Sequence, residues 1–119
     1  MRDMRNTIKN HRDFIMADDA PTARSPLFLI RMCPTRFDDG GRYGLTATKK
    51  TFRFAVDRNL AKRKLRDWIR FNEKHLIDGM DYVFIARRAI SDATRDDGRA
   101  AMGRALRYLK REHEPKKQS

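Results

Sequence analysis

Residues 55–70 (AVDRNLAKRKLRDWIR) constrain the fold most, because at helical spacing they sort into one apolar face and one basic face. At about 100° per residue, each face spans an arc of roughly 100°. The apolar arc holds Ala61, Leu65, Trp68 and Ile69. The basic arc holds Asn59, Lys62, Arg63, Arg66 and Arg70. Solvated helix faces usually mix charges, and Asp57 and Asp67 fall outside the basic arc. The segment therefore predicts a helix with one face in the core and the other against phosphates.

The overall charge agrees with a polyanionic partner. The chain has 119 residues, a size suited to one domain (1–119), and its 28 Lys and Arg against 16 Asp and Glu give a net charge of +12. A soluble protein that is merely cationic would have the same composition. No apolar run approaches the ~20 residues that span a bilayer, and the first residues lack the apolar core of a signal peptide. Cys33 is the only cysteine, so we expect a reducing cytoplasm. Cys33 is expected to be a small, buried or half-buried apolar residue and not a nucleophile.

The first half of the chain predicts a short helix and two or three strands. A polar arm (1–9) precedes a helix that carries Phe14, and residues 21–26 resemble a linker. Residues 27–32 are continuously apolar and predict a strand. Asp38, Asp39 and two glycines predict a tight reversal into a returning antiparallel strand over 42–48. Residues 51–54 fit either a third strand or an extended lead-in.

The second half predicts helix, strand, helix. The basic helix is expected over 55–76, with Gly79 at the turn that follows. Residues 82–86 predict a fully buried strand, and Ser91 or Thr94 caps a last helix before a charged tail (112–119). The order αβββαβα predicts an α+β fold, a small α/β sandwich with helices covering one sheet.

A catalytic centre cannot be assembled from these residues. His11, His75 and His113 are scattered and lack the spacing of a zinc site. No glycine-rich phosphate loop is present, and the paired acids at 38–39 and 96–97 point apart on a strand or helix. Binding is the favoured interpretation, and the protein is expected to hold no metal or cofactor.

Several segments resemble the bacterial ribonuclease P protein subunit. Thr48-Lys49-Lys50 followed by Ala55-Val56, Arg58-Asn59, Lys62-Arg63 and Arg66-Asp67 is similar to the family signature. Residues 8–14, 42–45 and 81–87 resemble further family segments, in the family's order. Leu60 departs from the pattern because it replaces the second arginine of the family's Arg-Asn-Arg triplet.

The resemblance implies a mostly antiparallel four-stranded sheet with a left-handed βαβ crossover, similar to the second domain of ribosomal protein S5. It implies one protein per catalytic RNA, and an accessory role in removing the 5′ leader of precursor tRNA. The RNA and its magnesium ions perform the hydrolysis, with no part for DNA or membrane. The residues expected to bind the catalytic RNA are Arg58, Asn59, Lys62, Arg63, Arg66 and Arg70. The residues expected to line a leader groove between sheet and helix are Phe14, Phe28, Tyr43, Lys49, Lys50 and Phe52.

Alternatives remain open at this point. Asn59 could instead cap the helix, and each ring of the leader groove could instead belong to the core. A basic ribosomal or RNA-chaperone protein has a similar composition. A DNA-binding helix-turn-helix regulator would use residues 55–70 as its recognition helix, but would need a short helix before them. A stand-alone nuclease lacks the residues for its chemistry.

Overall fold

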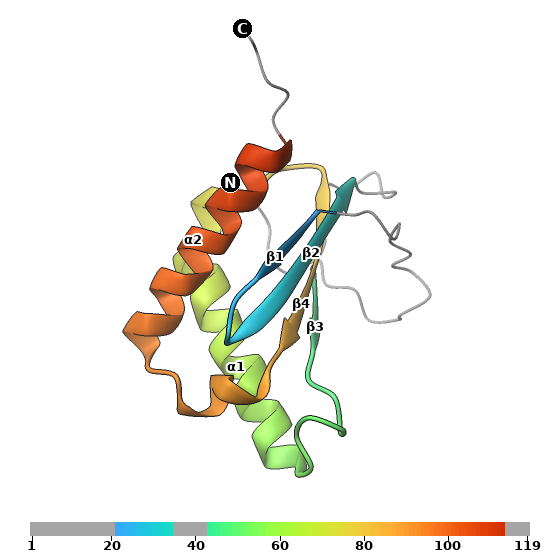
Figure 1. The fold of residues 1–119 in the computed structure, drawn as a ribbon, viewed down its shortest axis with the longest axis vertical. Coiled ribbons are helices and arrows are strands. Elements are labelled where there is room, and N and C mark those ends of the chain that lie inside the picture. The colour runs from blue at the N-terminus through green and yellow to red at the C-terminus, as the bar shows by residue number, and fades with distance from the viewer. Residues whose placement is uncertain (1–20, 35–42, 114–119) are drawn as a thin grey trace, which may run out of the picture.

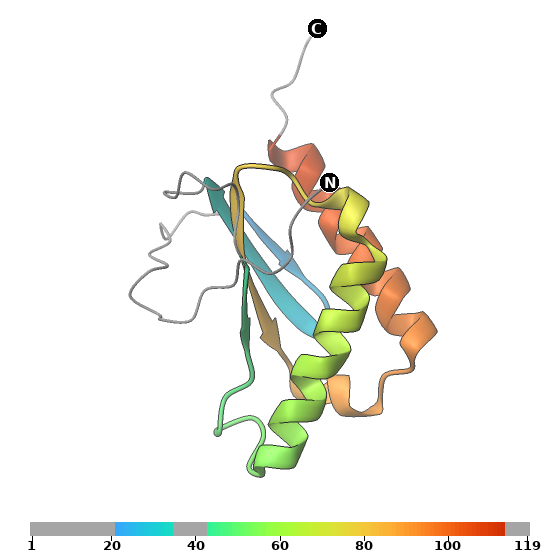
Figure 2. The same cartoon turned by 180° about the vertical axis from the view of Figure 1, so that it is seen from behind.

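The structure, a computed structural model, describes residues 21–34 and 43–113, which form a sheet covered by two helices. The strands are β1 (Thr22–Arg24), β2 (Phe28–Pro34), β3 (Tyr43–Thr46) and β4 (Met80–Ala86). The helices are α1 (Ala55–Phe71) and α2 (Arg95–His113), with 3-10 turns η2 (Glu73–His75) and η3 (Arg88–Asp92). Both α-helices lie on the same face of the sheet (Figures 1 and 2). This confirms the α+β sandwich.

The sheet has the strand order β1-β2-β4-β3. The β1–β2 and β2–β4 pairs are antiparallel, whereas β3 and β4 are parallel and joined through α1. The predominantly antiparallel, four-stranded sheet is therefore confirmed, with a βαβ unit across α1. The most apolar strand, β4, lies between β2 and β3, where both of its edges are hydrogen-bonded.

Two local predictions about the strands were wrong. The strand after the predicted reversal does not return along β2, because the buried strand β4 occupies that position and β3 pairs in parallel with β4. Residues 21–26 contain strand β1, in which only Ala23 faces the core, so no apolar alternation marked it. Of the two alternatives for residues 51–54, the structure has the extended lead-in and no third strand. The predicted arm, first helix and 38–41 reversal lie outside the described residues, as does the tail beyond His113.

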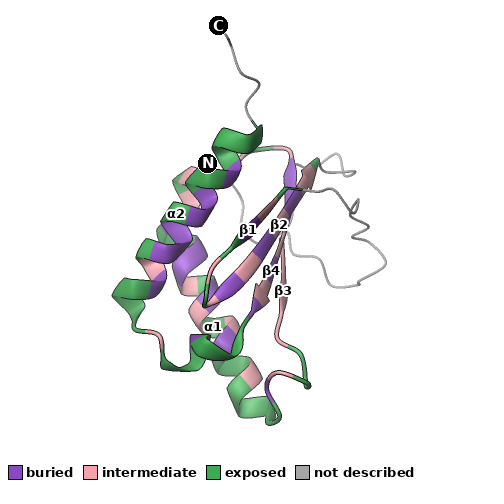
Figure 3. Cartoon of the chain, in the orientation of Figure 1, coloured by how far each residue is buried: buried purple, intermediate pink, exposed green. Residues whose placement is uncertain are grey.

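The core lies between the sheet and the helices (Figure 3). Alternate residues of β2 are buried, and their register neighbours on β4 are buried with them: Phe28, Ile30, Met32, Tyr82, Phe84 and Ala86. The predicted apolar arc of α1 is buried as expected. Cys33 is half-buried, within the range predicted for it. Each buried large side chain contributes about 1.5–3 kcal/mol of transfer free energy, so this layer fixes how α1 is rotated about its axis.

Asn72 ends α1 earlier than residue 76. Its side-chain amide is buried and donates hydrogen bonds to the carbonyl oxygens of Trp68 and Arg99, both at 2.9 Å. These bonds satisfy a terminal carbonyl of α1 and tie the helix end to α2. The chain then turns through η2 to Gly79, whose positive φ of 83° suits a glycine.

Helix α2 begins at the predicted cap. The Thr94 hydroxyl accepts a hydrogen bond from the Asp97 amide at 3.1 Å. One turn into the helix, Gly98 lies directly against Trp68, and a Cβ at this position would come within 1.9 Å of the indole ring. The absence of a side chain at Gly98 thus lets the two helices approach.

We predict that Gly98→Ala destabilises the fold by at least about 1–3 kcal/mol, since the fully buried indole cannot yield to the added methyl group. Helix propensity alone would favour alanine by about 1 kcal/mol. Ala100→Gly, at an exposed position of the same helix, measures that propensity term separately. Urea unfolding checks both variants, and a stabilising Gly98→Ala would contradict the packing of Trp68 on α2.

Candidate RNA interface

Helix α1 presents the predicted basic arc to solvent. We call Asn59, Lys62, Arg63, Arg66 and Arg70 the basic ridge. Asn59, Arg63, Arg66 and Arg70 are exposed, and Lys62 is half-buried. Phe54 occupies the N-cap position of α1, so Asn59 lies inside the helix and is not its cap. The ridge is therefore a continuous polar surface along most of the helix.

The acidic residue closest to the ridge in sequence is directed away from it. The Asp67 carboxylate accepts two hydrogen bonds from Arg99 of α2, from Nε at 3.1 Å and from Nη2 at 3.0 Å. The Arg99 guanidinium also lies 4.4 Å from the centroid of the Phe71 ring. Within residues 21–34 and 43–113, the structure shows no ion pair for the ridge cations. Their charge is available to an external polyanion.

Arg58 makes hydrogen bonds within the protein. It is half-buried, and its Nη1 donates to the carbonyl oxygens of Phe52 and Arg53 at 3.0 and 3.3 Å. These bonds hold the extended lead-in against the first turn of α1. In the structure Arg58 thus positions the segment that follows Lys49 and Lys50, and its contact with RNA stays a prediction.

Lys49 and Lys50 occupy an exposed turn between β3 and α1. The turn is closed by the Phe52 amide, which donates to the Thr48 carbonyl at 2.8 Å, and by the Thr51 amide, which donates to the Thr48 hydroxyl at 3.2 Å. Both lysines thus lie near the start of α1, where the helix dipole adds partial positive charge.

Tyr43 connects the β3 edge of the sheet to the ridge. Its ring packs edge-on against Phe84 with centroids 6.3 Å apart, and the residue is half-buried. Burial raises the pKa of its hydroxyl, and the nearby cations Arg66 and Arg70 act in the opposite direction. The ring is thus close to the ridge and partly accessible.

The predicted ring-lined groove between sheet and helix is wrong for two of its members. Phe28 is 0% exposed and Phe52 is 4% exposed, so neither ring can stack on a base. Phe28 instead packs against Trp68, with centroids 6.2 Å apart. The space between sheet and helices is filled by core, and Phe14 lies outside the described residues.

Lys64 is a positioning residue that the sequence analysis did not single out. Its Nζ donates to the carbonyl oxygens of Ile90, Ser91 and Ala93 at 2.9, 2.9 and 3.0 Å. All three donors are therefore used to hold η3 and the start of α2 against α1. Its place outside the basic arc was the only sequence signal of this different role.

The described residues contain no group of three or more His, Cys, Asp or Glu side chains placed to hold a metal ion. Burial, with nearby cations, lowers the pKa of His75 below its ordinary 6.5, which favours the neutral imidazole at neutral pH. No helix among the described residues is long and apolar enough to cross a membrane. The arrangement supports binding of an extended polyanion.

The fold and the basic ridge define a class, the small α+β RNA-binding proteins. Here a basic helix lies next to the edge of a sheet and is the surface for RNA. The family profile described as ribonuclease P matches residues 3–110. The Pseudomonas putida ribonuclease P protein component is 32% identical over 84% of this chain and 75% of its own length. The chain belongs to the ribonuclease P protein family.

Solved structures agree. A Staphylococcus aureus ribonuclease P protein mutant with defective mRNA degradation activity is 27% identical, with a TM-score of 0.73 over 87% of each chain. The Thermotoga maritima ribonuclease P protein shares the fold, with a TM-score of 0.71 over 87% of this chain and 97% of its own. Family membership gives this chain the role of a ribonuclease P protein subunit, which acts in tRNA processing and associates with the ribonuclease P RNA.

The ribosomal and RNA-chaperone interpretations are not favoured. The helix-turn-helix interpretation fails, since α1 follows a strand.

We predict that Arg63→Ala and Arg66→Ala each weaken binding to ribonuclease P RNA. Engagement of ~4–6 phosphates would give a slope of about −3 to −5 for log affinity against log salt, and each substitution should flatten it by about one unit. Arg107→Ala, an exposed arginine on α2, is the matched control. Binding titrations over a salt series provide the measurement. An unchanged slope in both ridge variants would remove these residues from the interface.

The Asp67–Arg99 pair predicts a pH-dependent contribution to stability. Hydrogen bonding to Arg99 lowers the pKa of Asp67 below its ordinary 3.8. The stabilisation is therefore complete above that ordinary value and is lost as the pH falls through the lower, folded-state value. We expect Asp67→Asn to be less stable than the parent at pH 7, with the difference shrinking below about pH 4.

Urea unfolding at several pH values measures this difference. Because the carboxylate is partly exposed, the effect should be modest. Asp92→Asn, an exposed carboxylate in η3, controls for the loss of one negative charge. A difference between Asp67→Asn and the parent that persists undiminished in acid would contradict the role of the ion pair.

Proposed function

We propose that this chain holds the catalytic RNA of ribonuclease P on its basic ridge and binds the 5′ leader of precursor tRNA at the β3 edge. The RNA and its magnesium ions hydrolyse the phosphodiester bond, and one protein serves one RNA in the cytoplasm. The observation that carries the proposal is that Tyr43 lies near the cations of the basic ridge, for which the described part of the chain provides no ion pair.

The ridge suits a folded RNA because its groups match phosphate and sugar. Arg63, Arg66 and Arg70 can each take a phosphate through two parallel hydrogen bonds. The exposed Asn59 amide can donate to a sugar or base edge and accept from one. A helix surface of this kind reads the shape of the RNA backbone rather than its sequence.

The β3 edge suits a single strand. The partly accessible Tyr43 ring offers a stacking surface, worth about 1–3 kcal/mol per base. Lys49 and Lys50 stand further along the chain on their exposed turn and can neutralise successive phosphates. A leader bound there would emerge beside the ridge and therefore beside the catalytic RNA. This surface replaces the ring-lined groove expected from the sequence.

Reconstitution tests the accessory role. Addition of the chain to a bacterial ribonuclease P RNA at low magnesium is expected to raise the rate of 5′ maturation of precursor tRNA. The chain without RNA is expected to leave precursor tRNA intact. Cleavage by the protein alone, or no change in RNA-catalysed maturation, would overturn the proposal.

Precursor tRNAs with a long and with a minimal leader distinguish the β3 edge from the basic ridge. With the reconstituted enzyme, Tyr43→Ala and Lys49→Ala should weaken binding of a long-leader precursor and leave a precursor with a minimal leader nearly unchanged. Tyr43→Phe keeps the ring and is expected to retain the parent's affinity. Equal losses for both precursors would place Tyr43 and Lys49 outside the leader site.

A further inference from the structure

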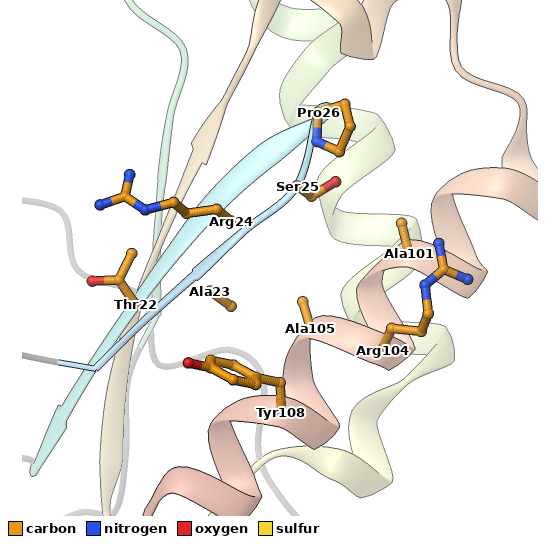
Figure 4. A pocket seen from close by; sticks show the side chains of 9 residues that line it. All are labelled: Thr22, Ala23, Arg24, Ser25, Pro26, Ala101, Arg104, Ala105 and Tyr108. Carbon is orange, nitrogen blue, oxygen red and sulfur yellow. The ribbon is translucent and has the colours of Figure 1, made fainter.

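A groove lies between the edge strand β1 and helix α2 (Figure 4). Its volume is about 430 Å³. Small side chains leave this space open, with Ala101 and Ala105 on the helix facing Ala23 and Ser25 on the other side. Strand β1 is at the opposite edge of the sheet from β3, so this groove is separate from the ridge and from Tyr43.

The groove has an accessible ring at one end. Tyr108 is 41% exposed, one of the most exposed large apolar side chains among the described residues, and its ring points towards β1 (Figure 4). Arg104 lies one helical turn earlier, and its side chain extends along α2 with the guanidinium beside Ala101 (Figure 4). A ring and a guanidinium one turn apart can engage a base and the neighbouring phosphate of the same strand.

The charge around the groove is positive. Arg87 lies at the Ser25 end, where its Nη1 donates to the Ser25 carbonyl at 3.3 Å. Arg24 adds a guanidinium on the far side of β1 (Figure 4). None of the described residues that line the groove is acidic. A polyanion is therefore the complementary occupant.

We propose that this groove binds an unpaired segment of RNA, with a base stacked on Tyr108 and a phosphate paired with Arg104. A peptide strand added to the β1 edge is the competing occupant. It is the weaker candidate because β1 has only three residues and can form few main-chain hydrogen bonds with a partner. Together with the ridge, the groove gives the protein two RNA sites on different sides.

The test uses the full chain and a labelled oligouridylate of about ten nucleotides. Tyr108→Ala is expected to lower its affinity about tenfold, within the range for loss of one stacked base. Tyr108→Phe is expected to retain the affinity. Arg104→Glu should weaken binding and flatten the salt dependence. Lys110→Glu makes an equal charge change elsewhere on α2, and in its background Tyr108→Ala should still lower the affinity about tenfold.

Two further measurements separate this groove from the ridge. The factor by which Tyr108→Ala lowers the affinity for the oligouridylate should be the same in an Arg63→Ala/Arg66→Ala background, since independent sites are additive in free energy. An oligouridylate carrying 4-thiouridine should photo-crosslink to Tyr108, as mapped by mass spectrometry. Unchanged affinity in both Tyr108→Ala and Arg104→Glu, or crosslinks confined to α1 and β3, would overturn the proposal. These outcomes do not depend on the catalytic RNA or on precursor tRNA.

Discussion

The contact of Trp68 with Gly98 is the constraint on which the interface depends. The indole is 1% exposed and packs against Phe28 of the sheet on one side and the backbone of α2 on another. It therefore fixes both the rotation of α1 about its axis and its distance from α2. With Ala61, Leu65 and Ile69 buried in the same layer, the basic arc can only face solvent. The ridge is a consequence of core packing.

Polar contacts within the protein then engage side chains of α1 that lie beside this surface. Arg99 binds the Asp67 carboxylate on the side of α1 that faces α2. Lys64 donates three hydrogen bonds to carbonyl oxygens around η3, and Arg58 donates to the carbonyl oxygens of the lead-in to the helix. Basic residues of α1 thus divide into those that position the fold and those that remain for RNA. Sequence spacing separates Lys64 from the ridge, but it does not separate Arg58.

How much the sequence could predict depended on whether a feature was local. The helical period of residues 55–70, the strand at 82–86 and the Thr94 cap are local signals, and the structure confirms them. Full burial of that strand was wrong, because Val83 and Ile85 are only half-buried. Strand pairing is non-local, so the place of β4 between β2 and β3 could not be read from the turn before β3. Ring accessibility is also non-local. Phe28, Phe52 and Tyr43 look alike in sequence, yet only Tyr43 lies at the sheet edge with its ring partly exposed.

Directed hydroxyl-radical cleavage tests the central claim most directly, namely that the exposed face of α1 lies against the ribonuclease P RNA. In a Cys33→Ser background, a tethered iron chelate is placed at Asn59→Cys on the ridge or at Asp92→Cys in η3, both exposed positions. The account predicts localised cuts in the ribonuclease P RNA from position 59 and none above background from position 92. Cuts from position 92 alone would show that another face of the protein meets the RNA.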